Sequence, residues 1–456
     1  MPRLIVSFPP FLGTSGSDLV VGQEDNAFLA IGIEVLKNGV IDTRGGNDTI
    51  KGSATGGDED FSSSEGAGTG AGTGTGIANS GIINAGKGDD TISGTGTDGF
   101  EYLSFAPGIG ISNTQGGYIN GGDGKDLISG TGNRGNDFLR GFAKGINNTQ
   151  DSHIDGGKGD DSIKGTGNGR GGGAGVGIFN SGGSDINGGE GKDSISGTGT
   201  IYNIGGDGTG IFNSDGSVIS GGKGNDSITG IGKGGEALAS PDRLNTPPGN
   251  GIGISNSKGS TISGGQGNDL ISGTGTGGRG DYGTPFGDYE PGVGTGILNS
   301  GSISLGDGKD TLVGTGISKG IGIVNTNGII CGGAGDDTLT GYGSSIGIQG
   351  GTIDGGSGND YFKARRIDDS GKPISDQGGA IANVLLKGGC GADTFDVGYG
   401  NATINGGSGW DKLILSDLKS DYTILGNSNN YTIKRDEFTL NVLNVEEIAF
   451  FGAAPL

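Results

Sequence analysis

One phrase returns along the whole chain: two glycines, a variable residue, a third glycine, another variable residue and an aspartate, followed by a small or polar residue and an aliphatic one. Its clearest copies are residues 121–128 and 221–228. Recurring self-similarity of this kind is the signature of a repeat architecture, in which one small unit buries its apolar face only by stacking on its neighbours. The phrase therefore constrains the fold more than any other feature of the sequence.

A second phrase, Gly-Ile-x-Asn, accompanies the first, and its asparagines are Asn79, Asn113, Asn148, Asn180, Asn213, Asn256, Asn299 and Asn325. From each asparagine to the next motif aspartate the chain takes 11 to 13 residues, whereas from that aspartate to the next asparagine it takes 15 to 30. One arc of the repeat is thus fixed in length, and the other is free to extrude loops after a Gly-Thr-Gly element. We expect the asparagines to stack as a ladder of amides at one turn.

This asymmetry predicts an all-β fold: a right-handed parallel β-helix, or solenoid, with one coil per repeat and the glycine-rich turns on one edge. Each coil should hold three short strands whose aliphatic residues alternate with small polar ones, so that Ile254, Ile262 and Ile271 point inward. We expect about ten coils over residues 30–411. The prediction divides the chain into a β-helix over residues 1–411 and a small C-terminal β cap over residues 412–456.

Composition leaves two structural alternatives. Glycine accounts for 113 of 456 residues and hydrophobic residues for only 30 %, well below the usual apolar share of a globular domain. Collagen is excluded because the glycines lack a Gly-X-Y period. Disorder is disfavoured because the aliphatic residues keep register with the glycines, but we expect it to return if a stabilising cation is removed.

The net charge limits the classes of partner that the chain can bind. With 51 acidic and 29 basic residues, the net charge is -22, which disfavours nucleic acid and anionic membrane surfaces and favours a metal cation. No apolar run is long enough to span a bilayer. The two cysteines, Cys331 and Cys390, lie about two coils apart in the repeat alignment, too far for a disulfide, so we expect two free thiols.

The motif has the chemistry of a metal site. Glycines at its first, second and fourth places are expected to adopt positive φ and to aim backbone carbonyls inward, while the sixth-place aspartate supplies a carboxylate. Stacked carboxylates about 5 Å apart repel one another by about 3 kcal/mol per pair at an effective dielectric constant of 20, so a cation would stabilise the stack. All-oxygen ligands favour calcium over zinc or copper. The alternative is a set of glycine turns that bind no metal.

Here the sequence resembles the RTX, or haemolysin-type, calcium-binding repeat family, whose nonapeptide is Gly-Gly-x-Gly-x-Asp-x-aliphatic-x. The resemblance covers roughly residues 13–418 and implies calcium between stacked turns, bound by the sixth-place aspartate and by backbone carbonyls. The implied ligands are Asp90, Asp126, Asp161, Asp193, Asp226, Asp269, Asp310, Asp337, Asp360, Asp393 and Asp411, with looser copies of the motif at Asp48 and Asp18. Family repeats run in tandem, whereas the aspartates from Asp48 to Asp393 are 23 to 43 residues apart. We therefore expect a wider coil with calcium along one edge only.

The C-terminal segment differs in kind, because from Lys412 onward it reads as short alternating strands with aromatic residues, suited to closing an open end of the helix. It is similar to the end of RTX proteins, where an uncleaved C-terminal signal directs type I export. The N-terminus lacks the pattern of a cleaved secretory signal. Together these features predict a secreted protein, extracellular or at the cell surface, where calcium is abundant.

Two functions remain open at this stage. The first is a calcium-rigidified structural or adhesive protein that binds a glycan or a cell-surface partner through loop aromatics, namely Phe100, Tyr102, Phe105, Phe138, Phe142, Tyr202, Tyr282, Phe286 and Tyr289. The second is a polysaccharide-modifying enzyme, a lyase or epimerase, on a β-helix scaffold. The single histidine, His153, shows no titratable partner in the sequence, and no catalytic motif is present. We therefore expect that the chain is not an enzyme.

Overall fold

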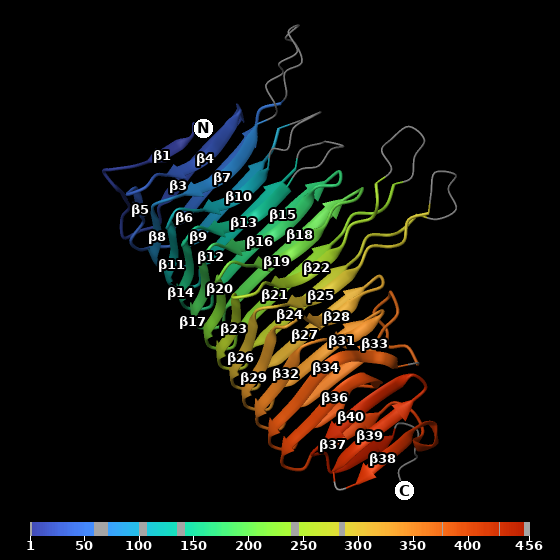
Figure 1. The fold of residues 1–456 in the computed structure, drawn as a ribbon. Coiled ribbons are helices and arrows are strands. Elements are labelled where there is room, and N and C mark those ends of the chain that lie inside the picture. The colour runs from blue at the N-terminus through green and yellow to red at the C-terminus, as the bar shows by residue number, and fades with distance from the viewer. Residues whose placement is uncertain are drawn as a thin grey trace.

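The computed structural model describes residues 2–58, 72–99, 107–134, 142–238, 246–281, 288–375, 377–427 and 429–450. It is a β-solenoid in which each coil contributes three strands that pair in parallel with the equivalent strands of the coils before and after it (Figure 1). The expectation of an all-β parallel β-helix is confirmed. Of the nine loop aromatics predicted to face a ligand, only Phe142, Tyr202 and Tyr289 lie within the described residues. No helix in the described part of the chain is long and apolar enough to cross a membrane.

The strands form three columns. The first-strand column is β1 (Leu4–Val6), β4 (Leu29–Val35), β7 (Thr73–Asn79), β10 (Gly108–Asn113), β13 (Phe142–Thr149), β16 (Ala174–Ser181), β19 (Gly208–Asn213), β22 (Gly251–Asn256), β25 (Gly294–Asn299), β28 (Ile321–Asn325) and β31 (Ile346–Gln349). The second-strand column is β2 (Phe11–Leu12), β5 (Val40–Asp42), β8 (Ile82–Lys87), β11 (Tyr118–Asp123), β14 (His153–Lys158), β17 (Asp185–Glu190), β20 (Val218–Lys223), β23 (Thr261–Gln266), β26 (Ser302–Asp307), β29 (Ile329–Ala334) and β32 (Thr352–Ser357).

The third-strand column forms a separate 14-stranded sheet. Its members are β3 (Leu19–Ala27), β6 (Thr49–Gly56), β9 (Thr91–Thr97), β12 (Leu127–Asn133), β15 (Ser162–Arg170), β18 (Ser194–Tyr202), β21 (Ser227–Lys233), β24 (Leu270–Thr276), β27 (Thr311–Ile317), β30 (Thr338–Gly343), β33 (Tyr361–Arg366), β35 (Thr394–Asp396), β37 (Lys412–Leu415) and β41 (Glu447–Phe450). The motif aspartate immediately precedes most of these strands.

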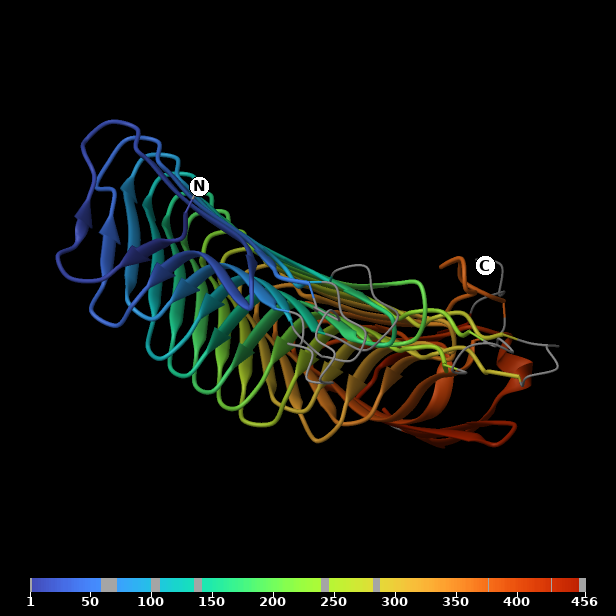
Figure 2. The ribbon, with the colours of Figure 1, turned by 90° about the horizontal axis from the view of Figure 1, so that it is seen from above.

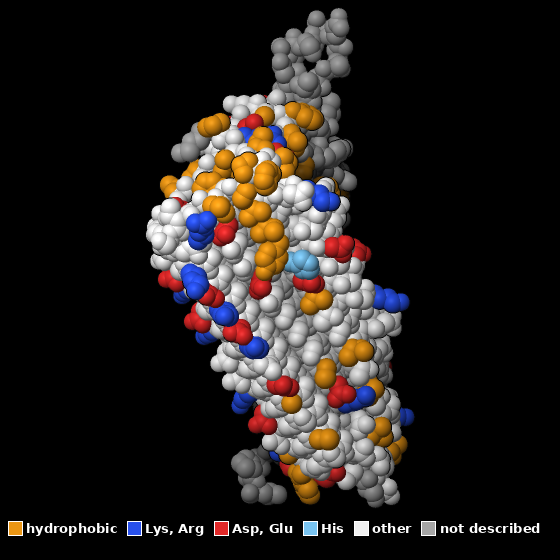
Figure 3. Space-filling model, turned by 90° about the vertical axis from the view of Figure 1, so that its left-hand side faces the viewer, with side chains coloured by type: hydrophobic (Ala, Val, Ile, Leu, Met, Phe, Trp, Pro, Cys, Tyr) orange, Lys and Arg blue, Asp and Glu red, His pale blue; other side chains and the backbone are white. Residues whose placement is uncertain are grey.

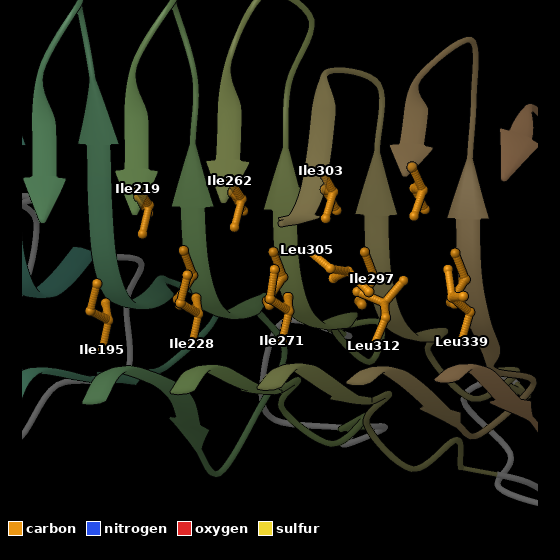
Figure 4. Packing of buried hydrophobic residues seen from close by; sticks show 14 of the residues in the cluster. Ile195, Ile219, Ile228, Ile262, Ile271, Ile297, Ile303, Leu305, Leu312 and Leu339 are labelled. Carbon is orange, nitrogen blue, oxygen red and sulfur yellow. The ribbon is translucent and has the colours of Figure 1, made fainter. Parts of the chain in front are cut away.

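The core consists of aliphatic ladders, one from each column. Ile254, Ile262 and Ile271 are fully buried, as predicted, and each pairs in register with an isoleucine or a leucine of the next coil. Figure 4 shows these ladders meeting in the interior, with one rung of each per coil. Toward the C-terminus the third-column ladder changes to Phe362 and Phe395, whose rings stack with their centroids 4.9 Å apart. Because each coil buries only a few side chains, stacking supplies the apolar core that a single coil lacks.

Beyond the aliphatic core, the first and third strands pack on each other through glycine. A carbon added to Gly94 would lie 2.2 Å from the carbonyl oxygen of Gly110, and one added to Gly110 would lie 2.1 Å from the backbone nitrogen of Thr131. The two layers are therefore too close for any side chain between them. This contact explains the glycines of the Gly-Thr-Gly element, while the threonine between them faces outward.

The C-terminal end departs from the repeating pattern. β34 (Gly378–Cys390) and β36 (Tyr399–Ser408) each run through both the first and the second columns, and the repeat from Asp393 to Asp411 shortens to 18 residues. The chain then adds β38 (Thr423–Asn427), β39 (Asn430–Arg435) and β40 (Phe438–Leu443), which pair antiparallel with one another. Because β40 also pairs with β36, this hairpin element continues the sheet at the end opposite the N-terminus (Figure 2).

Candidate functional site: a column of buried aspartates

The motif aspartates stack in one continuous column at a single edge of the helix. In each coil the backbone N–H of the motif aspartate donates to Oδ1 of the motif aspartate in the next coil, at 2.7–2.9 Å. The column begins at Asp18 and ends where the N–H of Asp411 donates to Oε2 of Glu446, at 2.8 Å. All thirteen predicted ligand residues are thus brought into one array. Sequence reasoning missed this carboxylate-to-backbone bond, which gives Oδ1 a role in joining coils.

The second carboxylate oxygen has no such role. Twelve Oδ2 atoms of the column are buried and have no hydrogen-bond partner: those of Asp48, Asp90, Asp126, Asp161, Asp193, Asp226, Asp269, Asp310, Asp337, Asp360, Asp393 and Asp411. None of these residues is more than 3 % exposed. A buried polar atom without a partner costs free energy, and here the cost recurs in every coil. Asp18 differs, because its Oδ2 accepts the N–H of Thr14 at 2.6 Å near the surface.

Burial also shifts the acidity of the column. Desolvation, together with the charges of neighbouring aspartates, raises the pKa of Asp126, Asp193, Asp337 and Asp393 to about 7. The same burial raises the pKa of Asp90, Asp161, Asp226, Asp310 and Asp360 to about 6. The hydrogen bond to Oδ1 opposes these shifts without cancelling them. In the protein alone, the column resists carrying its full negative charge.

Glycine is required in the motif for two different physical reasons, backbone conformation and close approach of neighbouring atoms. The second and fourth adopt left-handed backbone conformations, as at Gly122 (φ 116°) and Gly124 (φ 143°), which only glycine adopts readily. The first-place glycine does not have positive φ, so the expectation that it would was wrong. At Gly121 the reason is space, because a carbon added there would lie 2.7 Å from Asp126 Oδ2 and 2.4 Å from the carbonyl oxygen of Gly156.

The same two kinds of oxygen crowd the first-place glycine in other coils. A carbon at Gly188 would lie 2.8 Å from Asp193 Oδ2 and 2.3 Å from the carbonyl oxygen of Gly221, and Gly332 shows the equivalent pair. The strand register passes directly from Asn120–Asp155 to Gly122–Gly157, so the first-place glycines lie outside the regular pairing. A carboxylate oxygen of one coil and a carbonyl oxygen of the next therefore both lie close to the first-place glycine, which leaves no room for a side chain there. We call this pair of neighbouring oxygens the cradle.

Three coils depart from the glycine rule. Thr43 holds the first place before Asp48, Ala85 holds it before Asp90, and Leu305 holds it before Asp310. All three side chains are buried, and Figure 4 shows Leu305 among the core residues. The Oδ2 atoms of Asp48, Asp90 and Asp310 are nevertheless without partners. These coils keep the carboxylate but carry a side chain where the others have a glycine.

The outside of the turns balances its own charge. At the third place Lys158 faces Asp123 at 3.9 Å, and Lys223 faces Glu190 at 3.0 Å. The fifth-place residues alternate too, with Asp89, Lys125, Asp160 and Lys192 in successive coils. Figure 3 shows acidic and basic side chains interleaved along this edge. The uncompensated negative charge of the turns is therefore inside the helix, in the aspartate column.

Within the described ranges there is no cluster of three or more His, Cys, Asp or Glu side chains suited to a metal ion. Any cation in the cradle would depend on one carboxylate per coil together with backbone carbonyls, which is oxygen chemistry typical of calcium. Cys331 and Cys390 are free thiols, as expected, and lie two coils apart, on β29 and β34.

His153 has a partner that sequence reasoning missed. Its Nδ1 lies 3.2 Å from Oδ2 of Asp185 on the neighbouring strand, and both side chains are about half exposed. Tyr118 occupies the same outward position on the other side of His153. Aligning the second-strand column in register would have placed Asp185 beside His153. The group lies on the outer face of the sheet, away from the aspartate column.

No protein-family model matches this chain, and a search of curated proteins also finds no match.

Proposed function

We propose that this chain is a calcium-binding repeat protein of RTX-like character, whose β-helix is completed by calcium along the aspartate column. The observation that carries the proposal is the series of twelve buried Oδ2 atoms without hydrogen-bond partners. A native protein rarely leaves so many buried acceptors unsatisfied. A ligand that supplies positive charge to each of them accounts for the whole series at once.

The residues around the cradle fit a hard cation. Asp193 would offer Oδ2 while its Oδ1 keeps the backbone bond to Asp161. The first-place carbonyl of the following coil would offer a second oxygen, because it and Asp193 Oδ2 both lie close to Gly188. Calcium takes six to eight oxygen ligands in a flexible arrangement. Bound there, it would neutralise the buried carboxylates and offset their mutual repulsion.

We further propose that the protein is secreted and acts as a structural or adhesive component outside the cell, where calcium is plentiful. Calcium sites of modest affinity fill at roughly millimolar concentrations, as in extracellular modules. Net charge far from zero keeps a protein soluble, which suits a long rigid spacer carrying -22. The long sequence excursions after the third-strand column would be its contact sites for a glycan or a cell-surface partner.

Two adjacent residues provide a matched test of the calcium proposal. Asp161→Asn keeps an oxygen for the backbone N–H of Asp126 but removes the buried charge. Asp160→Asn removes a charge on the outside of the same turn, where asparagine already serves in other coils, as Asn225 does. We expect isothermal titration calorimetry to show one or two fewer calcium ions bound in Asp161→Asn and an unchanged number in Asp160→Asn.

The proposal fails if the wild-type chain binds no calcium at millimolar concentration. Equal stoichiometry in wild type and Asp161→Asn, with calcium bound in both, would place the metal elsewhere and exclude the aspartate column. Magnesium serves as the cation control, since it demands a tight octahedron and keeps its water molecules. We expect magnesium to bind far more weakly.

A further inference from the structure

The outer surface of the helix is hollowed where the first and second columns meet on its C-terminal side. The hollow has a volume of about 380 Å³ and lies across β34, β36 and β40, which run side by side in Figure 1. This volume falls within the range of about 300–1,000 Å³ that is typical of small-molecule sites. We call it the amide groove, because its polar lining is Asn383, Asn401, Thr403, Thr439 and Asn441.

The groove forms where the connection between the first and second strands becomes short. Four residues, 114–117, join β10 to β11, and the tip of this turn is exposed at Gln115 and Gly116. Only Gly350 and Gly351 lie between β31 and β32. β34 then pairs with both of these strands and passes the same corner without a turn, as β36 does after it. The surface at this corner is therefore recessed.

Asn383 faces outward at the position where earlier coils carry the buried asparagine column. The flanking pairs set Asn325, Gly350 and Asn383 at corresponding positions of successive coils. Asn325 is fully buried, whereas Asn383 is exposed with a φ of 53°, and the adjacent Val384 is buried. Asparagine adopts this left-handed conformation more readily than most residues. An amide that joins coils elsewhere is thus presented to a ligand here.

The lining offers hydrogen bonds of both kinds without charge. Amide and hydroxyl groups each supply donors and acceptors, and Asn401 is already oriented, because its Oδ1 accepts the N–H of Thr439 at 2.8 Å. Val384, Leu385 and Ala402 add apolar atoms between these groups. None of the described lining residues is charged. An anionic ligand would therefore find no counter-charge, and the net charge of -22 would repel it.

These properties distinguish between classes of ligand. A peptide that adds a strand needs an open sheet edge, whereas β36 is paired on both sides, with β34 and with β40. A nucleobase is usually held by stacking on an aromatic ring, and no aromatic residue is among the described lining residues. Closely spaced hydroxyls that both donate and accept, on a frame with apolar C–H groups, are the chemistry of an uncharged sugar.

We propose that the amide groove binds a short uncharged saccharide. Such a site deepens the adhesive role proposed above, and rests on it for its biological meaning, by placing a neutral-glycan site on paired strands. The groove lies at the corner of the asparagine column, away from the aspartate column. Because water competes for hydrogen bonds at an open site, we expect a dissociation constant in the millimolar range.

A substitution in the groove has a matched control on the same row of the second-strand column. Thr403 and Thr261 both occupy the outward row that runs through Ser302, Ile329 and Thr352, and both are partly buried. Thr403→Arg fills the groove, whereas Thr261→Arg places the same side chain several coils before it. Folding of each variant in millimolar calcium is checked by circular dichroism.

Saturation-transfer difference NMR measures binding of maltose, cellobiose, lactose and galactobiose to the full chain in millimolar calcium. We expect at least one of these disaccharides to give a signal with wild type and with Thr261→Arg, and none to do so with Thr403→Arg. If Thr403→Arg fails to fold, Asn383→Gly tests the same groove, because glycine keeps the left-handed backbone and removes the amide. We expect binding to Asn383→Gly to be about three- to tenfold weaker, as for the loss of one hydrogen bond.

The absence of a signal from all four sugars with wild type would overturn the proposal, and so would binding that is unchanged in Thr403→Arg or in Asn383→Gly. Digalacturonate is the charged counterpart of galactobiose. Tighter binding of digalacturonate than of galactobiose would assign the groove to acidic sugars and would also overturn the proposal. Calorimetric titration of the same samples with calcium distinguishes these failures from a failure of the calcium proposal.

Discussion

The helix has two internal polar columns, and they are built in opposite ways. In the asparagine column each side-chain nitrogen donates to the amide oxygen of the next coil at 2.8–3.0 Å, and Asn180 also donates to the carbonyl oxygens of Ser184 and Val218. In the aspartate column one oxygen per coil joins the stack and the other has no partner. Both columns are buried, and both repeat once per coil.

The difference shows which part of the fold is complete as protein alone. An amide carries both a donor and an acceptor, so a stack of amides satisfies itself. An ionised carboxylate carries acceptors only, so a stack of carboxylates requires a donor or a positive charge from elsewhere. The asparagine column therefore needs no further partner, whereas the aspartate column needs protons or cations. A change in one column can be compared with a matched change in the other.

The largest effect should come from removing calcium. With twelve unsatisfied carboxylates in one column and a net charge of -22, the metal-free chain approaches the composition of a disordered protein, and metal binding then contributes folding free energy. We expect far-ultraviolet circular dichroism in chelator at pH 7.5 to show mostly coil, and millimolar calcium to restore strand cooperatively. A strand-rich spectrum in chelator that calcium leaves unchanged would mean that the aliphatic and asparagine ladders hold the helix alone.

The next effect should be an unusual pH dependence. Burial raises the pKa of Asp126 and Asp193 from 3.8 to about 7, so the folded metal-free chain binds protons more tightly than the unfolded chain. Its stability is therefore greatest at low pH and falls as the pH rises from about 4 through 7. We expect the strand content in chelator, measured by far-ultraviolet circular dichroism, to rise on acidification from pH 7.5 to 5. In saturating calcium the slope should reverse, because protons compete with the cation.

Calorimetry at pH 6.5 tests independently how calcium binding is coupled to protonation of the aspartate column. Calcium binding should release protons from the column, so the apparent binding enthalpy should change with the ionisation enthalpy of the buffer. An enthalpy that is the same in all buffers would show that the ligands are already ionised. That result would contradict the raised pKa values of the column.

The repeat and its parallel stacking were predictable from the sequence, since the constant arc between the asparagines and the motif aspartates indicated one coil per repeat. The inward isoleucines followed from their alternation with small residues, and the asparagine ladder followed from its fixed place. The bond from the Asp126 backbone to Asp161 Oδ1 was not predictable, because it depends on how far one coil is offset from the next. Nor was the role of Gly121, which is set by the approach of Asp126 and Gly156 in space rather than by its own φ.

A smaller effect should distinguish the two columns at single residues. Asp226→Asn keeps an oxygen for the N–H of Asp193 and removes a buried charge, so we expect it to stabilise the chain in chelator and to weaken calcium binding. Asp226→Ala also leaves that N–H without an acceptor, and should cost a further 1–3 kcal/mol or so under both conditions. Urea denaturation in calcium, and in chelator at pH 5 where protonation of the column favours the folded chain, measures both effects.

The asparagine column supplies the reference. Asn213→Ala removes the donor to Asn256 and the acceptor for Asn180, and we expect it to destabilise the helix by a few kcal/mol to the same extent in calcium and in chelator at pH 5. If the loss in Asn213→Ala depended on calcium as strongly as the change in Asp226→Asn, the two columns would not be the independent devices described above.

The smallest effect should come from the cradle itself, at the place where three coils carry a side chain. Gly188→Ala puts a carbon 2.3 Å from the carbonyl oxygen of Gly221 and 2.8 Å from Asp193 Oδ2, which forces the backbone to move and pushes the two oxygens apart. We expect loss of the calcium bound there and a destabilisation of about 1–3 kcal/mol. The reverse change, Ala85→Gly, restores the usual glycine in the coil of Asp90. It should tighten calcium binding slightly while costing about 0.5–1 kcal/mol of stability in chelator at pH 5 from the added backbone freedom. Calcium titration of Ala85→Gly against wild type measures the gain, and equal or weaker binding would show that the first-place glycine serves only the close approach of the coils.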